Sequence, residues 1–317
     1  MGQSMTTTPY PTANLGLYPD FTAQYSSNLE LLLQQMQSVL RGHVTEQGGL
    51  VGKMASPVTQ YSSVTMKAPR GRFSPIDHTN PYSIRPWMFP QPGEIAELID
   101  SFDKLQTIVD PTSGYVKAAA AATGRYWDDG IIAAATGTRQ IGTDIGSLTP
   151  DTYSTTLFQV ASTFGSSAAS GLTVAKLIEA RRILRHFHND LDSDPPTIVI
   201  GSQQEADLLN QTQVVSTEFN DRPVLVDGRL RRFLGYDIAV SERLSQSASV
   251  RTAIVFVRSG ITLGLWKDME NYIDIRADLS GRPWQLTTQT MFGPVRTQNG
   301  KVVSILCSDS TGNDITP

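Results

Sequence analysis

Apolar residues recur at helical spacing in several stretches of the chain. Residues 28–42 carry leucine, methionine and valine every three or four positions and predict a helix. Residues 92–111 are amphipathic and acidic and predict a second helix. Residues 110–137 predict a third, longer one, and shorter helices are expected to start near Thr173 and Ser202.

The stretch 110–137, DPTSGYVKAAAAATGRYWDDGIIAAATG, differs from an ordinary core helix because alanine and glycine stand where leucine is usual. Pro111 suits a first helical turn, and Gly137 suits a helix end. Gly124 and Gly130 each cost about 1 kcal/mol relative to alanine, so a close backbone approach or a bend must require them. Membrane insertion and packing on a partner helix are alternatives at this point, and Lys117, Arg125, Asp128 and Asp129 exclude the membrane. The residues expected to pack the helix are Tyr115, Ala120, Gly124, Tyr126, Trp127 and Gly130.

Strand patterns fill much of the remaining chain and are segregated from the helices. Because helices and strands do not alternate, the sequence predicts an α+β protein with mostly antiparallel sheets. A further strand region, rich in Ser, Thr and Gly, is expected between residues 141 and 171. The other predicted strands are 197–200, 236–240, 253–257, 261–265, 272–276, 284–291 and 301–307.

Residues 48–92 have a different texture, with β-branched and aromatic segments on either side of the turn-rich stretch APRGRFSP. This pattern predicts a long hairpin whose tip is basic, with Lys67, Arg70 and Arg72. Few of its residues can pack locally, and a two-stranded ribbon is barely stable alone. We therefore expect the hairpin to project and to lie on another surface.

Composition and charge narrow the function classes. Charged residues make up 18% of the 317 residues and hydrophobic residues 39%, with a formal net charge of -4. Such a chain has no global basic field to hold nucleic acid through its phosphates. The single cysteine, Cys307, excludes an intrachain disulfide. No signal peptide is expected, because the first residues lack both a basic start and an apolar run. No membrane span is expected, because the longest uncharged run of interest, 152–175, is dominated by Ser, Thr, Gly and Ala.

The best candidate for chemistry is HFHNDLDSD at residues 186–194. His186 and His188 are two residues apart, and on a helix such residues point to different sides. The three aspartates of the segment lack the glycine and the final glutamate of a calcium loop. A charged helix end followed by a solvated turn is therefore favoured over a metal site, and no cofactor is predicted.

Five blocks of the sequence, in order, resemble the major capsid proteins of tailed bacteriophages, which have the Hong Kong 97 fold. The resemblance covers nearly the whole chain, from about Phe21 to Asp309. The blocks that carry it are DKLQTIVDPTSGYVKAAAAATGRYWDDGIIAAATGT (103–138), GLTVAKLIEARRIL (171–184), IVIGSQQEADLLN (198–210), FLGYDIAVSERL (233–244) and the stretch 259–307 beginning SGITLGLW.

The resemblance implies a division of the chain into the parts of that fold. The helix at 110–137 is implied to be the spine helix of the peripheral domain, lying flat on a sheet within a thin shell wall. The implied parts are an N-terminal arm at 1–47, an extended β-hairpin loop at 48–92, a peripheral domain at 93–137 and 253–309, an axial domain at 138–252 and a C-terminal tail at 310–317.

The resemblance also implies a function and partners. The chain is expected to be a structural protein and not an enzyme, assembling with itself into pentamers and hexamers of an icosahedral shell. The shell would enclose double-stranded DNA without sequence-specific binding and would be built in the host bacterial cytoplasm. A scaffolding protein and a portal protein are implied partners. Whether a decoration protein is also a partner is left open by the sequence. An encapsulin-type compartment, a metal-dependent enzyme and a tail or adhesin protein are the alternatives.

Two charged segments suggest how neighbouring copies would meet. The hairpin tip is basic and the expected helix at 92–111 is acidic, so the two surfaces are complementary. Contact between copies and simple solvation of both surfaces are weighed equally here, since exposed ion pairs contribute only about 0 to 1 kcal/mol. The residues proposed for this contact are Lys67, Arg70, Arg72, Arg85, Glu94, Glu97, Asp100 and Asp103.

Overall fold

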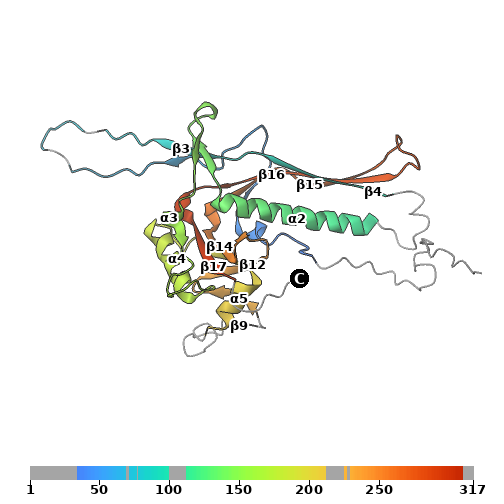
Figure 1. Ribbon diagram of the computed structural model, residues 1–317. Helices are drawn as coiled ribbons and strands as arrows, with labels where there is room; N and C mark the ends of the chain where they lie inside the picture. Colours follow the sequence, from blue (N-terminus) through green and yellow to red (C-terminus); the bar gives the residue numbers. More distant parts are fainter. Residues whose placement is uncertain are drawn as a thin grey trace, which may run out of the picture.

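The computed structural model describes residues 34–68, 71–76, 78–99, 112–211, 225–226 and 229–309. These residues form an α+β protein with an elongated upper part and a rounded body below it (Figure 1). In the elongated part, the 25-residue helix α2 (Thr112–Thr136) lies along a long sheet. At the left-hand end of this elongated part, a loop extends well beyond the body (Figure 1).

The long sheet has the strand order β1-β15-β16-β4. Its strands are β1 (Thr45–Gln47), β4 (Gln91–Ile99), β15 (Ile261–Ile275) and β16 (Trp284–Arg296). Strand β16 pairs antiparallel with both β15 and β4, and β1 runs parallel to the start of β15. The sequence predicts two strands, 261–265 and 272–276, where the structure has one. Register shifts on both sides of Lys267 break the side-chain alternation of β15, and this hides its continuity in the sequence.

The helix predicted at 92–111 is wrong for residues 92–99, which form most of β4. Residues 100–111, including Asp100 and Asp103, lie outside the described residues. Every residue of β4 pairs with β16, from Gln91 opposite Phe292 to Ile99 opposite Trp284. Nine ladder positions beside an existing strand outweigh a short amphipathic pattern, which as an isolated helix is marginal in water.

The body is built on a second sheet, of order β11-β12-β8-β14-β17-β7, with β13 attached to β14. Its central strand β8 is buried along its whole length, as expected of a strand covered on both faces. These strands are β7 (Gln159–Val160), β8 (Pro196–Ile200), β11 (Arg232–Phe233), β12 (Tyr236–Val240), β13 (Gln246–Ser247), β14 (Val250–Val257) and β17 (Val302–Ser308).

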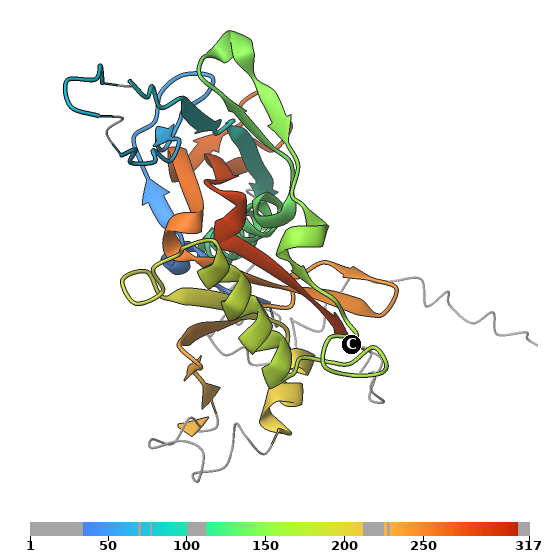
Figure 2. The same cartoon turned by 90° about the vertical axis from the view of Figure 1, so that its left-hand side faces the viewer.

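Helix α4 (Val174–His186) packs on this sheet in front of β17, as Figure 2 shows. It starts where the sequence predicts, because the Thr173 side chain accepts a hydrogen bond from the backbone N–H of Lys176. A second helix, α5 (Ser202–Leu209), follows β8 directly. The predicted boundary between peripheral and axial domains at residue 253 falls inside β14, whose pairing with β8 and β17 makes it part of the body.

A third sheet, of order β2-β3-β5-β6, joins the projecting loop to the body. Strands β2 and β3 are antiparallel and form the base of the hairpin predicted at residues 48–92. Short helical turns and one two-stranded ribbon complete the described chain. These elements are β2 (Gln60–Tyr61), β3 (Ser83–Trp87), β5 (Arg139–Gly142), β6 (Thr149–Asp151), β9 (Leu225–Val226), β10 (Arg229–Leu230), α3 (Thr155–Phe158), η2 (Arg41–His43), η3 (Ile145–Ser147), η4 (Arg258–Gly260) and η5 (Asn299–Lys301).

The helix predicted at 28–42 is wrong for its described part, since residues 34–40 are not helical and only the turn η2 follows. The backbone N–H groups of Val39 and Leu40 donate instead to the side chain of Asp128 in α2. The Leu40 side chain is fully buried. Tertiary contacts therefore satisfy these residues in place of helical hydrogen bonds.

The C-terminal end of α2 is held by an arginine from β16. The helix ends before Gly137, as expected, but Gly137 does not adopt the left-handed conformation typical of a glycine cap. Nη1 of the fully buried Arg296 instead donates to the carbonyls of Ala134 (3.1 Å), Ala135 (2.8 Å) and Gly137 (2.8 Å). Burial lowers the pKa of Arg296 to about 10, so the side chain stays charged at neutral pH.

We expect Arg296→Met to lower the free energy of unfolding by about 3 kcal/mol or more, because it leaves several buried acceptors without a donor. Arg296→Lys should fall between this variant and the native protein, since an ammonium can satisfy part of the set. Chemical denaturation measures both. Arg258→Met, at an exposed arginine, is the control and should change stability by less than about 0.5 kcal/mol. Equal effects at the two arginines would contradict the capping role.

Candidate functional site

The segment that the sequence offered for metal binding forms an ordinary turn. His186 ends α4, and the exposed carboxylate of Asp190 accepts hydrogen bonds from the backbone of Asp192 and from both the backbone and hydroxyl of Ser193. The Ser193 hydroxyl, followed by the backbone N–H groups, lowers the pKa of Asp190. Among the described residues, no three His, Cys, Asp or Glu side chains gather in a way that could hold a metal ion.

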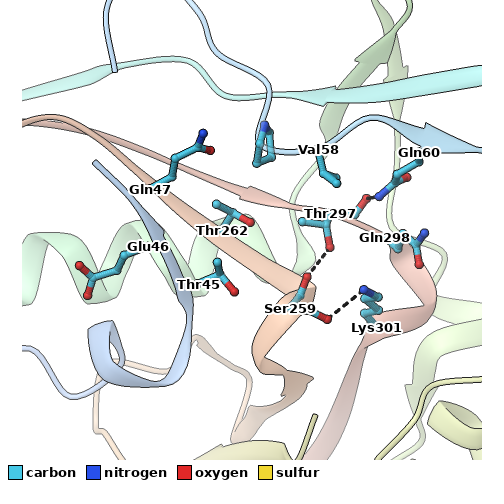
Figure 3. A pocket seen from close by; sticks show the side chains of 11 residues that line it. Thr45, Glu46, Gln47, Val58, Gln60, Ser259, Thr262, Thr297, Gln298 and Lys301 are labelled. Carbon is cyan, nitrogen blue, oxygen red and sulfur yellow. Dashed lines mark hydrogen bonds between the residues drawn. The ribbon is translucent and has the colours of Figure 1, made fainter. Parts of the chain in front are cut away.

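A cavity of about 390 Å³ lies where the base of the projecting loop meets the body (Figure 3). Its polar lining is largely engaged in hydrogen bonds: Lys301 Nζ donates to Ser259 Oγ (2.9 Å), and Gln60 Nε2 donates to the Thr297 carbonyl (2.9 Å). The Thr297 hydroxyl donates in turn to the Ser259 carbonyl (2.8 Å). The Gln60 contact ties the base of the loop to the body, and the other two contacts lie within the body.

The projecting loop presents basic and apolar side chains to solvent. Lys67 and Arg72 are exposed, whereas Arg70 lies outside the described residues. Arg85 is also exposed, but its Nε donates to Thr59 Oγ1 (3.0 Å) at the base of the loop. Met66 is 98% exposed, Phe73 101% and Ile76 83%. These exposed apolar side chains make the loop a candidate interaction surface.

The acidic residues predicted to share one face do not do so. Glu94 is exposed and Glu97 is half-buried, and they lie on opposite faces of β4 because side chains alternate along a strand. Within the described structure, Oε2 of Glu97 is buried and lacks a hydrogen-bond donor. Of the two described members of the predicted acidic set, Glu94 is therefore the one that a neighbouring molecule can reach more readily.

Several residues predicted to pack α2 lie against the long sheet. Trp127 is buried, and its Nε1 donates to Thr290 Oγ1 in β16 (3.2 Å). The Tyr126 ring meets Phe292 edge-on, with the ring centroids 5.0 Å apart, and its hydroxyl donates to the Pro92 carbonyl. At Gly130, a Cβ atom would lie 2.5 Å from Cε2 of Phe292. Here the glycine permits the close approach.

The rest of the predicted set faces elsewhere. A Cβ atom at Gly124 would lie 2.8 Å from the backbone nitrogen of Ser38, so this glycine meets residues 34–40 and not the sheet. Ala120 and Gly124 line a groove beside that segment, and Tyr115 is 40% exposed. The helix is thin on two sides because two different partners approach it.

Sequence patterns did not reveal Asp128, Ser38 and Arg41, which join the segment 34–41 to α2 and β15. A signal was present: Asp128 stands four residues after Gly124, so the two share a helix face. A carboxylate beside a glycine on the thin face of a helix indicates an approaching backbone. The sequence does not say which segment supplies that backbone.

A family model described as phage capsid protein matches residues 17–309, and the chain belongs to this family. No curated protein sequence matches the chain. Among the described residues, no helix has the length and hydropathy that crossing a membrane requires.

Solved structures similar to the chain share its fold at low sequence identity. The cyanophage Pam1 capsid matches with a TM-score of 0.69 at 12% identity, over 98% of this chain and 100% of that one. The capsid of cyanophage P-SCSP1u matches with a TM-score of 0.68 at 14% identity, over 92% and 94%. The capsid of Ralstonia phage GP4 matches with a TM-score of 0.64 at 10% identity, over the full length of both chains.

We expect Gly130→Ala to lower the free energy of unfolding by about 1–2 kcal/mol. The gain of about 1 kcal/mol in helix propensity is outweighed by overpacking against the fully buried Phe292 ring. Thermal or chemical unfolding measures the change. Gly146→Ala, where a Cβ meets nothing within 4 Å, should be nearly neutral. Adding Phe292→Leu should reduce the penalty of the Gly130 variant; independent effects would contradict the proposed contact.

Proposed function

We propose that this phage capsid protein assembles with itself into pentamers and hexamers of an icosahedral shell, which encloses double-stranded DNA. The observation that carries the proposal is the projecting loop with its exposed apolar side chains, Met66, Phe73 and Ile76. Exposed apolar side chains on such a loop gain stability when neighbouring copies cover them. Many such contacts add up in a closed shell even when each is weak.

The similar structures support self-assembly as the common use of this fold. One is described as a cyanophage Pam1 capsid asymmetric unit and another as the capsid of Ralstonia phage GP4. By analogy, we assign this chain to the shell of a virion that is assembled in the host bacterial cytoplasm. A scaffolding protein that guides closure and a portal protein at one vertex are the further partners we propose, and a decoration protein stays open.

The structural parts receive roles in the same proposal. We assign α2 as the spine helix of the peripheral domain and residues 48–92 as the extended loop. Residues 1–47 are proposed as the N-terminal arm, and the body as the axial domain that meets its copies around the symmetry axes. Because β14 and β17 belong to the sheet of the body, we assign them to the axial domain.

Assembly can be tested directly with the full-length chain. Expressed in bacteria and purified, it should yield closed particles in electron micrographs, or pentamers and hexamers by native mass spectrometry where closure needs a scaffolding protein. Monomers alone at micromolar concentration would contradict the proposal. Particles isolated from phage-producing cells should hold nuclease-resistant DNA, whereas an enzyme cargo would favour the encapsulin-type alternative.

Charge complementarity between copies gives a separate prediction. Lys67→Glu with Arg72→Glu should lower the yield of assembled particles roughly fivefold or more, because a small loss per contact is multiplied over the shell. Glu94→Lys in the same chain should restore part of the yield if these side chains meet across copies. Arg258→Glu, on the body, serves as the control for net charge. An unchanged yield would show that both surfaces are merely solvated.

A further inference from the structure

A buried carboxylate in the middle of α2 binds the residues that enter the fold from the N-terminal side. Asp128 has no exposed surface. Its two oxygens accept hydrogen bonds from Gln35 Nε2 (2.5 Å), Ser38 Oγ (2.5 Å), Val39 N (2.9 Å) and Leu40 N (3.2 Å). All four donors come from one six-residue stretch, about 90 positions away in sequence.

Two neighbours of Asp128 on the same helix hold the same stretch. Arg125 Nη1 donates to Gln34 Oε1 (2.9 Å) and to the Gln35 carbonyl (3.0 Å). At Gly124 the helix is so close to the Ser38 backbone that no Cβ atom fits between them. The contact is therefore shaped to this backbone and is not a chance pairing of side chains.

The stretch continues into a second set of contacts that reach the long sheet. Ser38 Oγ accepts from the backbone N–H of Arg41 (3.1 Å), which starts the turn η2. The Arg41 guanidinium pairs with Glu46 (3.0 Å) and Asp268 (3.2 Å), and it lies 4.5 Å from the centre of the Trp127 ring. Residues 34–41 thus join α2 to β15.

We propose that residues 34–41 and Asp128 form a latch that fixes the point at which the N-terminal chain leaves the folded body. Every donor to Asp128 comes from the segment itself; among the described residues no ion pair to this carboxylate forms, although Arg243, the partner of Asp129, interacts with it electrostatically. If the segment detaches, water can replace these donors, so the carboxylate loses its partners and its burial together. Such a contact opens and closes without leaving a stranded buried charge.

This geometry makes Asp128 a positioning residue for assembly, a step that rests on the proposed function. A closed latch holds Gln34 and the residues that follow it at one fixed place on α2 in every subunit. An open latch releases that constraint. The adjacent Asp129 differs, because it pairs with Arg243 at the surface and, in the described part of the chain, forms no hydrogen bond or ion pair with residues 34–41.

The sequence supplies a direct reporter of latch opening. Arg41 is the first basic residue in the sequence, so the bond between Arg41 and Gly42 is its most N-terminal trypsin site. The Arg41 side chain is held by its acidic partners, so cleavage there requires local opening. The exposed Lys67 and Arg72 provide internal reference sites, since their cleavage does not depend on the latch.

We expect Asp128→Asn and Ser38→Ala each to speed the appearance of a new N-terminus at Gly42 by about tenfold or more, because hydrogen bonds to a charged group are strong. Mass spectrometry of timed digests of the full chain measures this. Cleavage after Lys67 and Arg72 should be unchanged, and Asp129→Asn should match the native protein. Rates at Gly42 that equal the native rate in both latch variants, or equal acceleration in the Asp129 variant, would overturn the latch.

A combined variant separates a latch from general destabilisation. Because both side chains act in one contact, Asp128→Asn together with Ser38→Ala should accelerate cleavage no more than the stronger single change; additive effects would overturn the proposal. If Asp128→Asn does not fold, Gln35→Ala and Ser38→Ala, both on the segment, test the same contact. Particle counts of the latch variants then read out positioning. Native particle formation tests the proposed function independently of the tryptic assay.

Discussion

The architecture depends on how closely other segments approach α2. The helix carries small side chains on two sides, and each side receives a different partner. Phe292 of the long sheet fits against Gly130, and the backbone at Ser38 fits against Gly124. Larger residues at these positions would separate the layers. The helix therefore contacts both the long sheet and the segment 34–41 and fixes their positions relative to one another.

Buried polar groups then fix the helix along its own axis. Arg296 takes up the carbonyls at its C-terminal end, and Asp128 takes up backbone N–H groups of the entering segment. Hydrogen bonds of this kind depend strictly on geometry, and leaving one partner unpaired is costly. Small apolar side chains alone would hold the helix weakly along its axis. The polar contacts of Asp128 and Arg296 fix the position of α2 relative to the segment 34–41 and to β16.

The projecting loop differs from α2 because its large apolar side chains are exposed. Its base is paired through β2 and β3, whereas Met66, Phe73 and Ile76 have almost no cover from their own chain. The body has a buried core, whereas the apolar side chains of the loop are exposed; in the proposed shell, neighbouring copies cover them. This division suits a phage capsid protein, since strength within a subunit and adaptability between subunits come from different segments.

The sequence by itself determined the long helix, most strands of the two large sheets and the α+β class, because side-chain periodicity is a local property of these segments. The five sequence blocks also indicated the resemblance to phage capsid proteins. Only the tertiary structure decided that residues 92–99 are a strand and that residues 34–40 are not helical. In both cases the deciding partners, β16 and Asp128, are distant in sequence. Local periodicity cannot encode a hydrogen-bond partner that folding brings from elsewhere.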